Sequence, residues 1–233
     1  MDQINRHWLH CVLAGVLVLA IAAILMPKFP TDGAGFAPGY GSPVIAFEMA
    51  RSVADLHAVF GTPDDPARAT RIAMMDDGNR WDFVFMVAYG AFVALFLHAA
   101  AAASGRTILS LMAMLAITAA AADAVENVIL LGITADLEAA RDIGLLTYPV
   151  WIKFLGLMVT GMAAGMVIAT QGRHFWRILG VVAAAGALLV LPAFYDPATY
   201  GYLLTLGITV CWTIMLVFAI SRWLKKPAQG EHA

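Results

Sequence analysis

Six long apolar runs limit what this chain can fold into more than any other feature of its sequence. Each is roughly 20 residues long, which at about 1.5 Å per helical residue matches the roughly 30 Å hydrocarbon core of a bilayer. The candidate spans are residues 8–26, 81–103, 107–132, 145–170, 175–194 and 200–223. We therefore predict an all-α fold, a polytopic transmembrane helical bundle that forms a single membrane domain over residues 1–233.

The composition supports a membrane protein and excludes several other classes. Hydrophobic residues make up 61% of the chain and charged residues 13%, whereas soluble domains carry about 25% charged residues. This excludes a disordered chain, a nucleic-acid binder and a secreted disulfide scaffold. Cys11 and Cys211 fall at different depths on the first and last spans, so we expect no disulfide. Membrane lipid is the partner that such a surface requires, and the sequence gives no oligomeric state.

The first span resembles a signal peptide because Arg6 precedes an apolar run. The run is long for a signal peptide, however, and no small-x-small cleavage site follows Pro27. We expect a retained membrane anchor.

Basic residues are distributed unevenly between the two sets of connections. One side carries seven basic and two acidic residues, and the other carries six basic and eleven acidic residues. Because positive charge resists translocation, the more basic side is predicted to be cytoplasmic. Its charged residues are Arg6, Arg106, Arg173, Arg177, Arg222, Lys225, Lys226, Asp2 and Glu231. Both termini are therefore expected in the cytoplasm, with the loop over residues 27–80 on the outer side.

That extracytoplasmic loop is the only long connection in the chain. Its first part, residues 27–43, is rich in Gly and Pro and is expected to be irregular. Apolar residues then recur at helical spacing, and Glu48 lies on the opposite, polar face. We predict one amphipathic helix over about residues 44–60 that caps the bundle.

The most informative residues are polar side chains inside the predicted spans. An ionisable group at such a position costs about 2.5–3.5 kcal/mol on insertion scales, so each needs a partner or a function. These ionisable residues are Asp82, Asp123, Glu126 and Lys153, and they are accompanied by Tyr89 and Asn127. The spacing of Asp123, Glu126 and Asn127 places all three on one helical face.

These groups share one level in the outer half of the membrane. Counted from the outer end of each span at 1.5 Å per residue, the depths are about 9 Å for Glu126, 10 Å for Lys153, 11 Å for Tyr89 and 13 Å for Asp123. Asp82 lies close to the surface, and the loop helix that carries Glu48 lies above. We take all seven residues as candidates for ligand binding or a proton relay at one periplasm-facing polar site.

The residue types narrow the chemistry of this site only partly. Carboxylates with an amide, and without His or Cys nearby, are typical of a hard cation such as Mg²⁺ or Ca²⁺. The ammonium of Lys153 would repel a divalent ion, so we expect no metal and no cofactor. The sequence contains no Walker loop, nucleophile elbow or HExxH motif, and no catalytic residue is assigned.

Three short patterns resemble a group of bacterial integral membrane proteins of unknown function. They are Phe47-Glu48 before the loop helix, Trp81-Asp82-Phe83 with Tyr89 at the start of a span, and Asp123-x-x-Glu126-Asn127 in the next span. The resemblance covers about residues 45–155. It implies a multi-pass protein of the bacterial inner (plasma) membrane, and it implies no activity.

Two classes of function stay open on the sequence alone. In the first, which we favour, a small molecule or lipid reaches the polar site, and the protein is a transporter, a receptor or an enzyme. In the second, the protein is a non-catalytic membrane subunit or scaffold whose intramembrane charges are structural ion pairs. A closed and fully paired cluster would favour the scaffold, whereas carboxylates that point to different sides of the bundle would contradict the first class.

Overall fold

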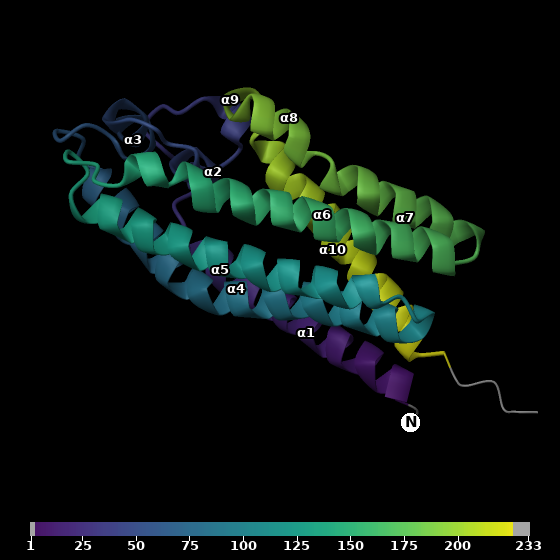
Figure 1. The fold of residues 1–233 in the computed structure, drawn as a ribbon. Helices are drawn as coiled ribbons and strands as arrows, with labels where there is room; N and C mark the ends of the chain where they lie inside the picture. The colour runs from purple at the N-terminus through teal and green to yellow at the C-terminus, as the bar shows by residue number, and fades with distance from the viewer. Residues whose placement is uncertain (1–2, 226–233) are drawn as a thin grey trace, which may run out of the picture.

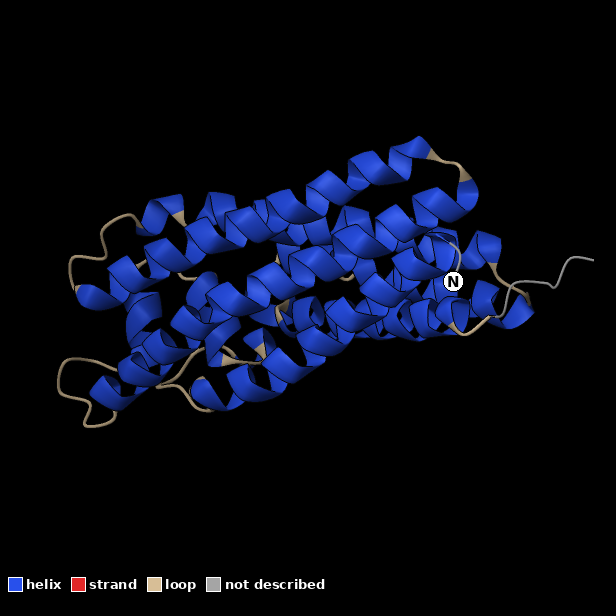
Figure 2. Ribbon diagram, turned by 90° about the horizontal axis from the view of Figure 1, so that it is seen from below, coloured by secondary structure: helices blue, strands red, loops and turns tan. Residues whose placement is uncertain are grey.

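The computed structural model describes residues 3–225, which fold into α-helices joined by loops and short 3-10 turns (Figure 1 and Figure 2). No strand occurs within this range, so the all-α fold class is confirmed. The helices are α1 (Gln3–Leu25), α2 (Pro43–Glu48), α3 (Val53–Phe60), α4 (Arg68–Ser104), α5 (Thr107–Ala135), α6 (Thr147–Gln171), α7 (His174–Ala187), α8 (Val190–Tyr195), α9 (Pro197–Tyr200) and α10 (Tyr202–Trp223).

Six helical segments in the described part of the chain are long and apolar enough to cross a membrane, as predicted. They run over Gln3–Lys28, Arg68–Ser104, Thr107–Ala135, Ile143–Gln171, His174–Tyr195 and Tyr202–Trp223. The largest difference from the sequence prediction is at α4, which begins at Arg68 rather than near Trp81. Its first turns are helical but carry many charged side chains, so an apolar-run criterion does not include them.

The membrane-length helices pack in a closed circuit. Each contacts the next in the order α1, α4, α5, α6, α7 and α10, and α10 returns to α1. Near the chain termini, the Trp8 ring lies 5.6 Å from the ring of Phe96 and 5.8 Å from that of Phe218, centroid to centroid. All three side chains are almost fully buried. The first helix is thus packed into the bundle through a large aromatic side chain.

The start of α1 and the end of α10 lie at one end of the bundle, and α2 and α3 lie at the other (Figure 1). Of the charged residues used for the orientation prediction, Asp2, Lys226 and Glu231 lie outside the described residues. The remaining residues of the more basic group belong to the end that holds the start of α1.

The predicted loop helix over residues 44–60 is wrong in one respect, because the structure has two short helices there. Ser52 starts the second helix: its hydroxyl accepts a hydrogen bond from the Asp55 backbone N–H at 3.2 Å, a typical N-cap contact. Arg51 closes the first, since its Nη1 donates to the carbonyls of Glu48 and Ala50 at 3.1 and 2.7 Å. The break lets Glu48 turn into the bundle, whereas an unbroken amphipathic helix would have turned it outward.

The two short helices are held over the bundle end by an apolar contact. The rings of Phe47 and Phe60 meet edge to face at a centroid distance of 4.8 Å, and both side chains are fully buried. On the outer side, Glu138 in the loop after α5 accepts hydrogen bonds from Arg68 at 2.7 Å and lies 3.1 Å from His57 Nε2. These contacts fix α2 and α3 against α4 and the following loop, which defines the position of Glu48.

Small residues allow α6 and α7 to approach each other closely. A Cβ atom at Gly165 would lie 2.6 Å from the Ala184 nitrogen and 2.7 Å from the Gly180 carbonyl oxygen. Backbone atoms cannot give way as a flexible side chain does, so glycine is required at this crossing. Close approach of this kind is typical of packing between membrane helices.

We predict that Gly165→Ala lowers the melting temperature of the purified protein. Overpacking of this kind costs about 1–3 kcal/mol of unfolding free energy. Gly132→Ala is the matched control, because a Cβ there meets nothing within 4 Å. Alanine favours a helix over glycine by about 1 kcal/mol, so the control is expected to be neutral or stabilising. Equal melting temperatures for the two variants in one detergent would contradict this account of the crossing.

Candidate functional site

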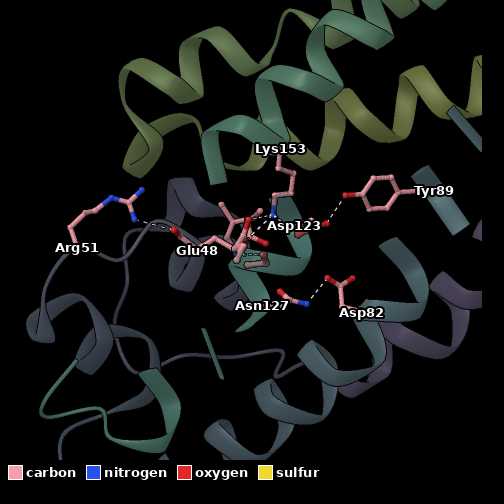
Figure 3. Close-up of polar contacts among 10 residues, drawn as sticks. Glu48, Arg51, Asp82, Tyr89, Asp123, Asn127 and Lys153 are labelled. Atoms are coloured by element: carbon pink, nitrogen blue, oxygen red, sulfur yellow. Dashed lines mark hydrogen bonds and ion pairs between the residues drawn. The ribbon is translucent and has the colours of Figure 1, made fainter. Parts of the chain in front are cut away.

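The candidate site lies under α2, where side chains from four helices converge (Figure 3). Residues from α4 and α5 supply most of the polar groups, α6 supplies an ammonium, and α2 supplies a carboxylate from outside the spans. The contributing residues are Asp82 and Tyr89 of α4, Asp123, Glu126 and Asn127 of α5, Lys153 of α6, and Glu48 of α2.

Lys153 occupies the centre of the site and contacts three carboxylates. Its Nζ lies 2.8 Å from each carboxylate oxygen of Glu126. It also lies 3.1 Å from Asp123 Oδ1 and 3.1 Å from Glu48 Oε2. We call Glu48, Asp123, Glu126 and Lys153 the carboxylate cluster. Three negative groups from two helices and the loop thus surround one positive group.

The cluster is almost closed to its surroundings. Glu126 is 0% exposed, Lys153 4%, Asp123 6% and Glu48 8%. Charges that are removed from water to this extent are tolerated only when they are paired and hydrogen-bonded. The mutual pairing of these groups is therefore a condition for the local fold.

Acceptors outnumber donors in the cluster. An ammonium has three N–H donors, while three carboxylates present six oxygens. Two of the buried oxygens, Glu48 Oε2 and Glu126 Oε2, have no hydrogen bond of acceptable geometry, although both lie within ion-pair distance of Lys153. The ammonium alone therefore does not satisfy the carboxylates around it.

A second shell of polar groups extends from the cluster along α4. The Tyr89 hydroxyl donates to Asp123 Oδ2 at 2.7 Å. Asn127 Nδ2 donates to Asp82 Oδ2 and to the Asn79 carbonyl, both at 3.0 Å. Asp82 is therefore joined to α5 through Asn127, while Tyr89 fixes the orientation of the Asp123 carboxylate.

Glu48 has an electrostatic environment that favours its protonated form. Burial raises the pKa of Glu48 above its ordinary value. The Lys153 ammonium acts in the opposite direction, and the negative charge of Asp123 raises the pKa further. Desolvation is the largest of these effects, so Glu48 is the carboxyl of the cluster that we expect to retain a proton at neutral pH.

The structure brings all seven sequence-predicted residues into one connected network, and the carboxylates of the cluster point toward the same ammonium (Figure 3). Sequence reasoning assigned Glu48 to an outward polar face, which is wrong, because its carboxylate is buried against Lys153. It also missed Asn79 and Arg51, whose contributions are a backbone carbonyl and a helix-ending side chain. Nothing in their spacing indicates these roles.

Within residues 3–225, no group of three or more His, Cys, Asp or Glu side chains is arranged to hold a metal ion. The position that a cation would take among the carboxylates is filled by the Lys153 ammonium.

No family model matches the chain, and neither curated proteins nor solved structures contain a significant match.

The raised pKa of Glu48 predicts how stability depends on pH. A carboxyl with a raised pKa in the folded state gives its full stabilisation below its ordinary pKa of 4.5. That stabilisation is lost as the pH rises through the folded-state pKa. Glu48→Gln has a permanently neutral side chain, so its melting temperature should rise relative to wild type as the pH increases from about 5 upward.

The measurement is thermal denaturation of both proteins over a pH series, with Asp64→Asn, an exposed loop residue, as the control that should follow wild type. The opposite trend, in which wild type gains on Glu48→Gln as the pH rises, would mean that an ionised Glu48 pairs with Lys153.

Proposed function

We propose that this integral membrane protein binds an amine-bearing small molecule or lipid at the carboxylate cluster, in exchange for the Lys153 ammonium. The observation that supports the proposal is the ratio of three carboxylates to one ammonium within 3.1 Å. A structural ion pair between two helices needs only one carboxylate for one lysine.

The energies of membrane packing favour a functional origin for the additional carboxylates. Each ionisable group in a span costs about 2.5–3.5 kcal/mol on insertion scales, whereas polar contacts between membrane helices contribute about 0.6 kcal/mol on average. Glycine and alanine already pack α6 against α7. Carboxylates in excess therefore add little stability, but they provide a site where an ammonium is strongly attracted.

The geometry around the cluster suits a primary ammonium. Such a group donates three hydrogen bonds, as a lysine does. A ligand ammonium that took the place of Lys153 Nζ would meet carboxylates from α2 and α5, with Tyr89 holding Asp123 in place. Transport, sensing and proton transfer to a bound amine all begin with this binding step.

The proposed setting is the bacterial inner membrane, with both termini in the cytoplasm and α2 on the periplasmic side. The excess of basic residues at the opposite end supports this orientation. The resemblance to bacterial multi-pass proteins over residues 45–155 supports the choice of membrane.

One observation favours the alternative, a non-catalytic membrane subunit or scaffold. The cluster is closed, with Glu126 fully buried and every carboxylate within reach of Lys153. In that case the network would hold α2, α5 and α6 together and would not exchange its cation.

Ethylammonium distinguishes the two functions. We expect ethylammonium chloride to raise the melting temperature of the detergent-purified protein in a saturable way. Tetramethylammonium chloride at equal ionic strength should not do so, because it has no N–H donor. A ligand present at a hundred times its dissociation constant stabilises the folded state by about 2.7 kcal/mol.

The variant Glu126→Gln should lose this response, and Asp64→Asn, whose exposed carboxylate lies in the loop before α4, should retain it. A wild-type protein that melts cooperatively at the same temperature with and without ethylammonium would contradict the proposed function and would support the scaffold.

A further inference from the structure

We propose that the amine ligand is a single-chain amphiphile, a long-chain primary amine, that reaches the carboxylate cluster from within the bilayer through an aromatic passage between α4 and α10. The inference rests on the proposed function and adds the class of ligand and its route. It is carried by the juxtaposition of Phe85, Tyr89 and Trp212 with Asp123.

Three aromatic side chains form the passage. The Trp212 ring of α10 lies 5.2 Å from the Tyr89 ring and 6.3 Å from the Phe85 ring, centroid to centroid. Phe85 and Tyr89 are themselves 5.6 Å apart on successive turns of α4. Tyr89 then donates directly to Asp123. The path from Trp212 to the cluster is therefore only one side chain long.

The outer end of this path is accessible from the surface of the bundle. Tyr89 is buried, but Phe85 and Trp212 are each only partly buried. For helices that cross a membrane, the exposed surface at this depth faces lipid chains. A molecule in the bilayer would thus meet Trp212 and Phe85 before it meets Tyr89.

The helix packing agrees with an opening at this level. Toward the chain termini, α10 is covered by α1, where a Cβ at Gly15 would lie 2.7 Å from Leu216 Cδ1 and Trp8 contacts Phe218. One turn closer to α2, Trp212 reaches from α10 to α4. Here the two helices meet through large rings, which can change rotamer, and not through a backbone crossing.

A small hollow continues the apolar surface beside Trp212. It is lined by residues of α6, α7, α8 and α10, among them Leu157, Met158 and Trp212. Its volume is only about 10 Å³, so an alkyl chain would have to move side chains to occupy it. Leu157 lies one helical turn from Lys153, which places this apolar surface next to the cluster.

The charge of the cluster selects among amphiphiles with an amine. A phospholipid with an ethanolamine headgroup would bring its phosphate toward Glu48, Asp123 and Glu126, where like charges repel strongly at low dielectric. Lys153 is the only cation in the cluster. A ligand whose sole polar group is the amine avoids this repulsion and leaves its chain among the aromatic rings.

The chemistry of transfer is balanced. A long-chain amine crosses lipid as the neutral species and accepts the proton of a cluster carboxyl. The carboxyl O–H bond breaks, an N–H bond forms on the amine, and an ammonium and a carboxylate remain with no change in total charge. A cluster with more carboxyls than ammonium groups can supply this proton.

The test uses dodecylamine that carries a photoreactive diazirine in the middle of its chain. The full protein in lipid nanodiscs is irradiated with this probe, and the labelled residues are located by mass spectrometry. We expect labels on α4 and α10 near Phe85 and Trp212, reduced about tenfold by excess ethylammonium and in Glu126→Gln. Trp212→Ala should reduce labelling by up to about tenfold, because ring contacts of this type contribute roughly 0.5–1.5 kcal/mol.

Trp223→Ala removes a tryptophan from the other end of α10 and serves as the matched control, with labelling unchanged. Labels on α2 and α3 that ethylammonium still displaces would overturn the passage and leave the proposed function intact. Labels that ethylammonium does not displace, or labelling equal in wild type and Glu126→Gln, would overturn both.

Discussion

The burial of one ammonium among three carboxylates is the interaction on which the polar end of this bundle depends. Lys153 contacts Glu126, Asp123 and Glu48 at 2.8 to 3.1 Å, so one side chain joins α6 to α5 and to α2. Loss of one partner from a buried ion pair leaves an uncompensated charge and costs about 3–5 kcal/mol. The cluster is therefore a structural element, whatever else it does.

The features around the cluster follow from the need to reach Lys153 and to balance its partners. The loop helix is interrupted at Arg51 and Ser52, which allows Glu48 to enter the bundle. Tyr89 orients Asp123 from the side of α4. The number of carboxylates still exceeds what the ammonium requires, and this excess distinguishes a site that exchanges a cation or a proton from a simple helix tie.

The sequence predicts the spans well and the cap poorly, for physical reasons. Span number follows from the thickness of the bilayer, which any helix of this composition must match. Shared depth on α5 and α6 also follows from the helical rise, which is why Glu126 and Lys153 could be paired before the fold was known. The direction of Glu48 could not, because it depends on a break created by a side chain capping its neighbours. The contact of Trp212 with Tyr89 depends on how α10 crosses the bundle, and no periodicity encodes it.

Infrared spectroscopy of the carboxyl groups tests the central claim most directly, because a protonated carboxyl has a C=O band distinct from that of a carboxylate. We predict that the wild-type protein at neutral pH shows a buried, slowly deuterated carboxylic acid band that decreases in Glu48→Gln and stays unchanged in Asp64→Asn. A wild-type spectrum without such a band would mean that all three carboxylates are ionised around Lys153, and it would contradict the account of a cluster that holds an exchangeable proton.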